Sequence, residues 1–172
     1  MSATETLLPE LTQPGRSAVA EAGKYLTFLL GNEEYGLPVL RIREIIKLMD
    51  ITPVPQVPQH VKGVINLRGK VIPVVDLRLK FGFATQEYTA QACIIVVDVV
   101  TAQGRMLMGV VVDAVSEVMT IGAADIEVTP EFGDRVQTDY ISGLAKAKGG
   151  VKILLDLDRV LGTDGARVAG GA

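Results

Sequence analysis

The sequence predicts an all-β protein made of two related lobes, and two features of it support this fold class. From Lys24 onward, short runs rich in Val, Ile and Leu are separated by Gly, Pro and charged residues. This pattern is typical of six to ten strands, with few helices, in a barrel or a sandwich. The two halves of the chain also match each other, which indicates one design that has been duplicated.

The duplication follows two spacings. "YGLPVLRIREI" (35–45) aligns with "MGVVVDAVSEV" (108–118), a shift of 109 − 36 = 73 residues. In the later part of each half the shift is 143 − 63 = 80 residues, and it relates four pairs of identical residues: Gly63 and Gly143, Gly69 and Gly149, Asp76 and Asp156, Gly82 and Gly162. We therefore expect a domain over 24–162, with a first lobe at about 24–85 and a second at about 86–162. Exchange of strands between the lobes stays open.

The segments outside the domain have no apolar pattern. Residues 1–23 and 163–172 are expected to be a flexible arm and tail, with a weakly developed final helix. The arm lacks a positive region followed by an apolar one, so no signal peptide is expected. No apolar run reaches the ~20 residues of a membrane-spanning helix. These features predict a cytoplasmic protein.

Two segments before Gly63 give separate predictions, one for a helix and one for a connector. "RIREIIKLMD" (41–50) places Ile42, Ile45, Ile46 and Met49 at i, i+3, i+4 and i+7. This spacing predicts an amphipathic helix whose apolar face packs on the core of the protein. The proline-rich "TPVPQVPQ" (52–59) predicts an extended connector.

The stretch "GVINLRGKVIPVVDLRLKFG" (63–82) predicts a hairpin. "LRGK" is a glycine-containing turn between two apolar runs, so Asn66 and Arg68 are expected at or beside an exposed tip. Pro73 cannot donate a hydrogen bond to a strand ladder, which indicates an edge strand or a bulge. The second half has Lys146 and Lys148 in place of the Asn and the Arg. Either a role in binding or an ordinary solvated turn would explain the Asn-Arg pair.

Asp76 and Asp156 are predicted to be structural residues. Each ends an apolar run and precedes five residues that are closed by a glycine, Gly82 or Gly162. Aspartate at a helix start accepts a backbone N–H, and glycine is the common residue just after a helix end. We expect two short capped helices here.

Composition disfavours several classes of function. The net charge is −3 and only 5% of residues are aromatic, whereas nucleic-acid binders combine a basic face with stacking aromatics. His60 is the only histidine and Cys93 the only cysteine, too few for a structural zinc site. Cys93 lies in the apolar run "ACIIVV" and is expected to be a small core residue. The phosphate-binding motifs GxxxxGK(S/T) and GxGxxG and the nucleophile motif GxSxG are absent. We therefore expect no cofactor, no metal and no enzymatic activity.

The stretches "GNEEYGLPVLRIREI", "VKGVINLRGKVIPVVDLRLKFG" and "GVVVDAVSEV" together resemble the CheW family of chemotaxis coupling proteins. The resemblance covers about 24–162. It implies two five-stranded SH3-like β-barrels that share a hydrophobic core. It also implies a non-enzymatic adaptor that joins the cytoplasmic tips of chemoreceptors to the regulatory domain of the CheA histidine kinase. The chain alone would be a monomer that forms rings and arrays with its partners under the membrane, without inserting into it.

The resemblance also implies roles for individual residues. Glu44 and Arg68 would form an ion pair at a receptor-facing surface. The groove for the receptor would contain or adjoin four further residues: Val39, Ile42, Ile45 and Asn66. Glu131 and Phe132 match the loop by which the second lobe would meet the kinase.

This sequence departs from the family pattern at two positions. Pro38 stands where a polar or acidic residue is more common, which puts the neighbouring strand edge in doubt. Glu127 stands where a basic residue can occur near the ring interface. Two alternatives to the chemotaxis adaptor remain: a barrel that binds a small ligand or an oligonucleotide, and an adaptor for a kinase pathway unrelated to motility.

Overall fold

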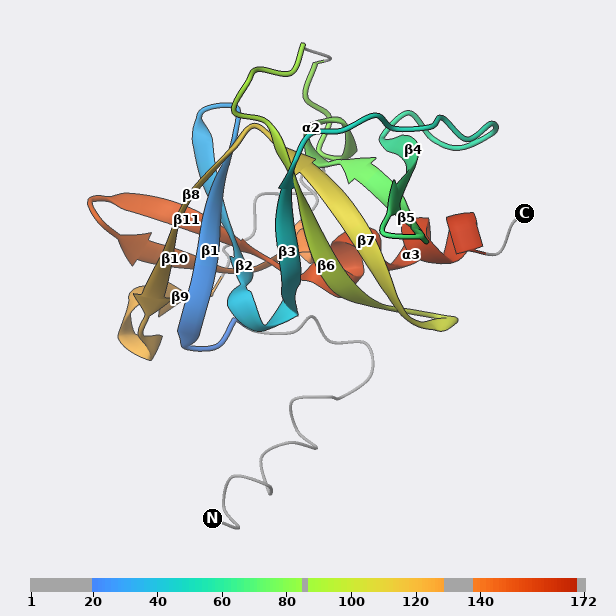
Figure 1. Cartoon of the computed structure of the whole chain (residues 1–172). Helices are drawn as coiled ribbons and strands as arrows, with labels where there is room; N and C mark the ends of the chain where they lie inside the picture. Colours follow the sequence, from blue (N-terminus) through green and yellow to red (C-terminus); the bar gives the residue numbers. More distant parts are fainter. Residues whose placement is uncertain (1–19, 85–86, 129–137, 170–172) are drawn as a thin grey trace.

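A computed structural model of the chain describes residues 20–84, 87–128 and 138–169 (Figure 1). In these ranges the chain forms eleven strands, two α-helices and three short 3₁₀ helices. The strands are β1 (Gly23–Leu30), β2 (Glu33–Pro38), β3 (Ile42–Lys47), β4 (Val61–Leu67), β5 (Lys70–Asp76), β6 (Cys93–Thr101), β7 (Gly104–Val112), β8 (Ala114–Ile121), β9 (Ile126–Glu127), β10 (Ile141–Ala147) and β11 (Gly150–Leu155). The helices are η1 (Val39–Arg41), α2 (Leu77–Lys80), η2 (Ala123–Asp125), η3 (Thr138–Tyr140) and α3 (Leu157–Ala169).

The strands form two sheets, and each sheet takes strands from both halves of the chain. The six-stranded sheet has the order β8-β1-β2-β11-β10-β9 and the five-stranded sheet the order β3-β6-β7-β5-β4. The all-β prediction is confirmed. The upper limit of ten strands is one too low, since the described residues form eleven.

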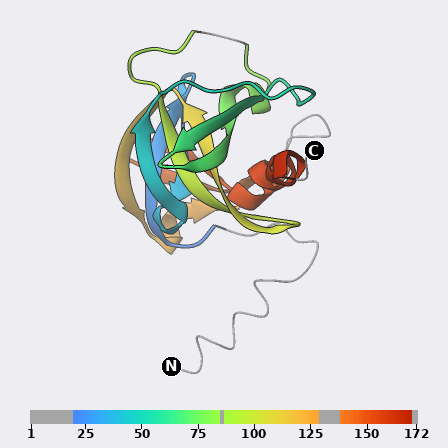
Figure 2. The same cartoon turned by 45° about the vertical axis from the view of Figure 1, so that its right-hand side comes forward.

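Three clusters of buried side chains hold the sheets. The largest lies between the sheets and joins Phe28 and Leu37 of one to Val75 and Val97 of the other, with Leu161 of α3 against them. A second cluster lies on the opposite face of the five-stranded sheet, and a third lies among β1, β8, β10 and β11. The predicted shared core is therefore present, and each sheet has a smaller core of its own. The curvature of the strands around these interiors is visible in Figure 2.

The duplication is visible in the backbone. The β4–β5 and β10–β11 hairpins both have two-residue turns, at Arg68-Gly69 (φ 51° and 87°) and at Lys148-Gly149 (φ 49° and 77°). Two positive φ angles in a row define the type of turn whose twist suits a hairpin. Both hairpins also have a register shift at the glycine that begins the match, Gly63 or Gly143.

The parallel strand pairs follow the same symmetry. Gly36 of β2 pairs with Leu154 of β11, and Gly109 of β7 pairs with Val74 of β5. The differences are 109 − 36 = 73 and 154 − 74 = 80, which are the two spacings of the sequence. Two copies of one unit have therefore exchanged strands across the shared core. From here on the first lobe means the five-stranded sheet and the second lobe the six-stranded sheet.

The predicted aspartate caps are confirmed. Asp76 Oδ1 accepts hydrogen bonds from the backbone N–H groups of Arg78 at 2.9 Å and Leu79 at 3.3 Å. Asp156 accepts from the N–H of Arg159 at 3.3 Å.

The predicted helix end at Gly162 and the flexible tail from 163 are wrong as far as Ala169. Helix α3 continues through Gly162 because it packs along β6 (Figure 2). Val160, Leu161 and Asp164 of this helix are all buried. Tertiary packing thus overrides a local stop signal.

The predicted helix over 41–50 is also wrong. Residues Ile42–Lys47 form strand β3, which pairs antiparallel with β6. Burial alternates along it, with Ile42, Glu44 and Ile46 less exposed than their neighbours. Branched side chains such as Ile favour strands. One edge of β6 is paired with β7, and β3 pairs with the other edge.

Pro73 does not lie on an edge strand, since β5 runs between β4 and β7. Pairing of β5 with β7 begins at Val74. Pro73 therefore falls where β5 has only β4 as a partner, and the missing N–H donor costs the sheet little.

Candidate interaction surface

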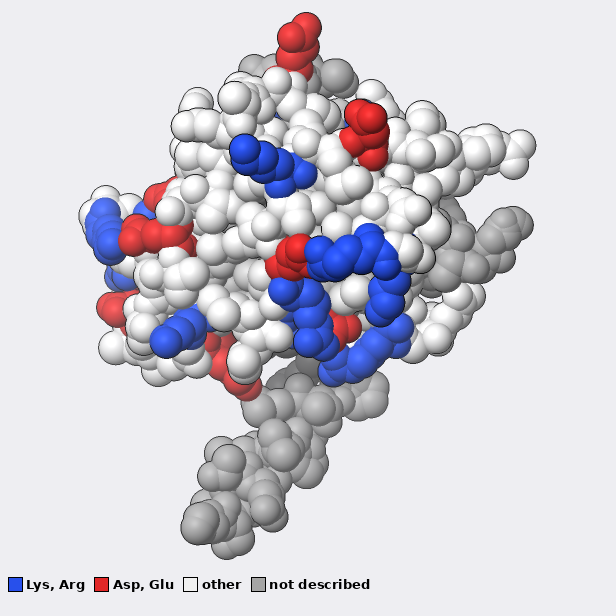
Figure 3. Space-filling view, viewed as in Figure 1, with Lys and Arg blue, Asp and Glu red and all other residues white. Residues whose placement is uncertain are grey.

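A groove of about 740 Å³ opens at one end of the five-stranded sheet. Both apolar and charged side chains line it, and the charged ones are visible around the hollow in Figure 3. We call it the mouth, and it is lined by Arg43, Glu44, Leu67, Arg68, Lys70, Ile72, Val96, Asp98, Arg105, Met106 and Leu107. The mouth brings together side chains from β3, the β4–β5 hairpin, β6 and β7.

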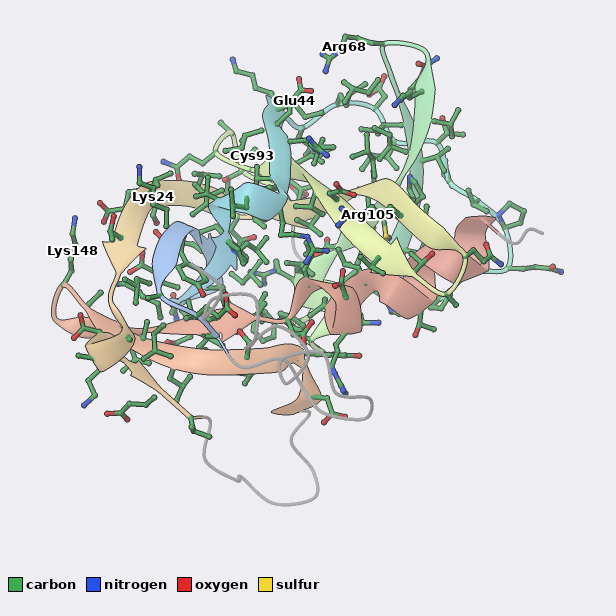
Figure 4. All side chains as sticks on the ribbon, turned by 90° about the horizontal axis from the view of Figure 1, so that it is seen from below. Lys24, Glu44, Arg68, Cys93, Arg105 and Lys148 are labelled. Atoms are coloured by element: carbon green, nitrogen blue, oxygen red, sulfur yellow. The ribbon has the colours of Figure 1, made fainter. Side chains whose placement is uncertain are left out.

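The expected ion pair between Glu44 and Arg68 forms across this mouth (Figure 4). The Arg68 guanidinium donates to both carboxylate oxygens of Glu44, through Nη1 to Oε2 at 3.1 Å and through Nη2 to Oε1. These hydrogen bonds hold the pKa of the Glu44 carboxyl below its usual range. Since β3 and β4 are the outer strands of the sheet, the pair links its two edges.

Asn66 supports the turn that carries Arg68. Its side-chain oxygen accepts a hydrogen bond from the N–H of Gly69 at 2.9 Å, which is the local bonding that favours Asn at turns. The side chain is otherwise exposed. The structure therefore assigns Asn66 a positioning contact within the hairpin.

The three apolar residues of the predicted receptor groove lie on η1 and β3, and none of them lines the mouth. Ile45, next to Glu44 on β3, is 45% exposed. Val39 and Ile42 are half-buried and pack against the shared core. Val39 lines a second groove of about 560 Å³ beside Leu40, whose side chain is almost fully exposed at 95%.

The second lobe has a counterpart of the Glu44–Arg68 pair. Lys148 Nζ lies 2.7 Å from Glu117 Oε1, and the spacings are 117 − 44 = 73 and 148 − 68 = 80. Lys148 is on the other lobe, away from Arg68 (Figure 4). Both lobes thus contain an ion pair between an edge strand and a hairpin tip. The guanidinium and Asn66 are what the second lobe lacks.

Glu127, one of the two departures from the family pattern, pairs with Lys146 at 2.5 Å. Pro38, the other departure, ends β2 opposite Tyr25 of β1. Glu131 and Phe132 lie outside the described residues.

Sequence reasoning missed the polar cluster around Asp98. Asp98 lies on β6 and its side chain is only 11% exposed, yet its Oδ2 receives Arg43 Nη2 at 2.9 Å and Arg105 Nη1 at 3.0 Å. The hydrogen bond from Arg43 and the charges of Arg105 and Arg41 lower the pKa of this carboxyl. An aspartate inside "IIVVDVV" was the available signal, because a buried charge needs a partner.

Two further observations concern groups considered from the sequence. Cys93 is a half-buried free thiol whose pKa is raised by burial. His60 Nε2 lies 2.8 Å from Asp164 Oδ1. In the described ranges no three His, Cys, Asp or Glu side chains are grouped to hold a metal ion. Nor is any helix in those ranges long and apolar enough to span a membrane.

Fold and mouth together define a two-lobed β-barrel protein with a charged groove at its surface. The chain belongs to the CheW family, whose CheW-like domain matches residues 24–164.

Named relatives agree with this membership. The chain is 36% identical over 141 residues to the chemotaxis protein CheW of Klebsiella aerogenes, covering 82% of each chain. It is 34% identical over 150 residues to the chemotaxis protein CheW of Rhizobium meliloti, covering 87% of this chain and 90% of that one. The solved scaffolding protein TtCheW from Thermoanaerobacter tengcongensis has a TM-score of 0.73 and 34% identity, over 81% of this chain and 92% of that chain.

Proposed function

We propose that this protein is a non-enzymatic adaptor of chemotaxis that couples the cytoplasmic tips of chemoreceptors to a CheA-type histidine kinase. Membership of the CheW family supports the adaptor role. The observation that carries the receptor side is the Arg68 guanidinium, which makes two contacts with Glu44 at an exposed hairpin tip where the second lobe has a lysine with one. The adaptor would work in the cytoplasm, in rings and arrays at the inner face of the membrane.

The receptor-facing surface of this proposal has a charged part and an apolar part. Glu44 and Arg68, with Asn66 holding the turn, would fix the orientation of a helical receptor tip. Ile45 would add exposed apolar area, and Val39 and Ile42 would extend the contact toward the lobe boundary. The kinase side would use Glu131 and Phe132 on the second lobe.

The mechanism would depend on combining weak contacts. Interfaces below about 1,200 Å² are typical of transient signalling encounters. When several of them act within one array, the later binding events become intramolecular and the assembly is strengthened without new contacts. Receptor state would then reach the kinase through the arrangement of the adaptor between them.

The test is reconstitution of the purified protein with a chemoreceptor cytoplasmic fragment and a CheA-type kinase. Kinase autophosphorylation and co-sedimentation are measured for all pairs and for the three components together. Activation that needs all three components supports the proposal. Failure of the folded protein to bind either partner contradicts it.

Arg68→Ala tests the residue assignment, and Lys148→Ala is its matched control. Each variant removes one exposed cation and its ion pair from an equivalent hairpin. Because such pairs contribute little to stability, both melting temperatures should fall by less than about 3 °C. Only Arg68→Ala should weaken binding of the receptor fragment. Equal receptor binding by the two variants would refute the assignment.

A further inference from the structure

The mouth holds more positive than negative charge. Four cations, Arg43, Arg68, Lys70 and Arg105, surround two anions, Glu44 and Asp98. The balance of the mouth is therefore 4 − 2 = +2, on a chain whose net charge is −3. Figure 3 shows Lys and Arg side chains in a ring around the hollow at this end of the molecule.

The ion pairs within the mouth do not neutralise all of its positive charge. Asp98 is shared by Arg43 and Arg105, so one carboxylate faces two guanidinium groups. Lys70 is exposed, and in the described ranges no acidic side chain lies within ion-pair distance of it. Both guanidinium groups on Asp98 also keep about two thirds of their side-chain surface in solvent, at 62% and 67%. Each guanidinium group therefore has exposed surface beyond its contact with Asp98 that an incoming anion can reach.

The floor of the mouth is apolar. Ile72 and Val96 are buried, and Leu67 and Leu107 pack against the same cluster. An occupant that fits this environment carries a negative charge beside an apolar body. Carboxylates suit Arg particularly well, because the planar guanidinium can donate two parallel hydrogen bonds.

We infer that the mouth receives a carboxylate-bearing segment of the chemoreceptor tip, with an Asp or Glu flanked by apolar side chains. This inference rests on the proposed function and adds Arg43, Lys70 and Arg105 to its receptor-facing surface. Charge complementarity selects an acidic segment, and the Glu44–Arg68 pair makes the mouth continuous with the surface proposed for the receptor. The surplus charge would act mainly on encounter, since rim charges raise association rates in a manner that salt suppresses.

The test compares two double variants that each remove two positive charges. Lys70→Gln/Arg105→Gln brings the mouth to 2 − 2 = 0, and Asp98 keeps Arg43 as its partner. The control is Lys146→Gln/Lys148→Gln, on the equivalent hairpin of the second lobe, where both lysines are about two-thirds exposed. Circular dichroism checks that all proteins are folded.

Association with a receptor cytoplasmic fragment is measured by surface plasmon resonance at low and high salt, and the kinase regulatory domain is measured separately. We expect the mouth variant to associate with the receptor about tenfold more slowly at low salt, with the difference lost at high salt. The control variant should match the wild type. Neither variant should lose kinase binding.

Three results would overturn the inference. A mouth variant that binds the receptor as fast as the wild type removes this inference and leaves the proposed function intact. If the mouth variant loses binding only to the kinase regulatory domain, the mouth binds the kinase and not the receptor. Co-sedimentation with vesicles of phosphatidylcholine and phosphatidylserine, present in the wild type and absent in the mouth variant, would make a lipid headgroup the occupant. Absence of receptor binding by the wild type would instead contradict the proposed function itself.

Discussion

Removal of Asp164 should destabilise the fold strongly, since this carboxylate is the centre of a buried polar cluster. Asp164 lies on α3 and is only 2% exposed. Its Oδ2 accepts from Lys80 Nζ at 2.8 Å and its Oδ1 faces His60 Nε2 at 2.8 Å. The Lys80 side chain is itself only 10% exposed. Asp164→Ala therefore leaves an ammonium group buried without its counter-ion.

Loss of one partner of a buried ion pair costs about 3–5 kcal/mol. The Tyr140 ring, whose centroid is 5.4 Å from Lys80 Nζ, remains as a weak partner, so we expect about 3 kcal/mol. For a chain of this size that corresponds to a fall of roughly 6–12 °C in melting temperature. Urea unfolding followed by circular dichroism gives the free energy directly, with Lys148→Ala as the exposed-pair control.

The double variant Lys80→Met/Asp164→Leu separates a lost ion pair from a disrupted helix. Replacing both members of a buried pair with apolar residues is often nearly neutral. The double variant should therefore recover most of the stability lost in Asp164→Ala. If Asp164→Ala costs less than about 1 kcal/mol, or if the double variant is no better, the ion pair is not what holds α3.

Two further predictions concern the backbone and acid stability. Gly63 has φ 141°, and a Cβ there would lie 2.0 Å from the backbone oxygen of Thr52. Gly63→Ala should therefore cost about 3 kcal/mol or more in urea unfolding. The equivalent Gly143→Ala, whose nearest contacts are 3.0–3.3 Å, should cost clearly less, and equal losses would contradict the steric argument. Hydrogen bonding by Arg43 lowers the pKa of Asp98, so its contribution is present above pH about 4 and is lost as pH falls through the folded-state pKa. Asp98→Asn should lose less stability than the wild type between pH 5 and pH 2, and parallel pH curves would refute this role.

Local sequence signals were sufficient where the responsible contacts are local. The "LRGK" turn predicted the hairpin tip at Arg68, since a two-residue turn is set by the backbone angles of its own residues. Asp76 was predicted as a cap because its hydrogen bonds reach only two and three residues ahead. The 73- and 80-residue spacings predicted the duplication, since each lobe repeats the same short-range patterns.

Features that depend on distant partners could not be predicted in the same way. Strand β3 has a spacing that also fits a helix, and only the edge of β6 decides between them. Gly162 signals a helix end, yet α3 continues because its next turn carries Asp164 to Lys80, 84 residues away in the sequence. Asp98 collects Arg43 and Arg105 from two neighbouring strands. Of these contacts only Asp98–Arg105, seven residues apart, falls within a short window of sequence, and the others join residues that are more than 40 positions apart.

Comparison of the two lobes separates what the fold needs from what a partner would need. Both lobes carry an ion pair between an edge strand and a hairpin tip, Glu44–Arg68 and Glu117–Lys148. An ion pair that both copies contain is explained by its role in joining an edge strand to a hairpin. It does not require a binding partner. In the second lobe each hairpin lysine has one acidic partner, since Lys146 faces Glu127.

The mouth of the first lobe has two cations more than it has anions, and its ion pair uses a guanidinium with two contacts instead of an ammonium with one. Arg provides two fixed donors to a carboxylate, whereas Lys provides a point charge. In the described ranges the surplus of cations and the two-contact guanidinium occur only in the first lobe, so the role that the ion pair has in both lobes does not explain them. Variants that remove them should therefore change receptor binding while leaving the stability of the fold nearly unchanged.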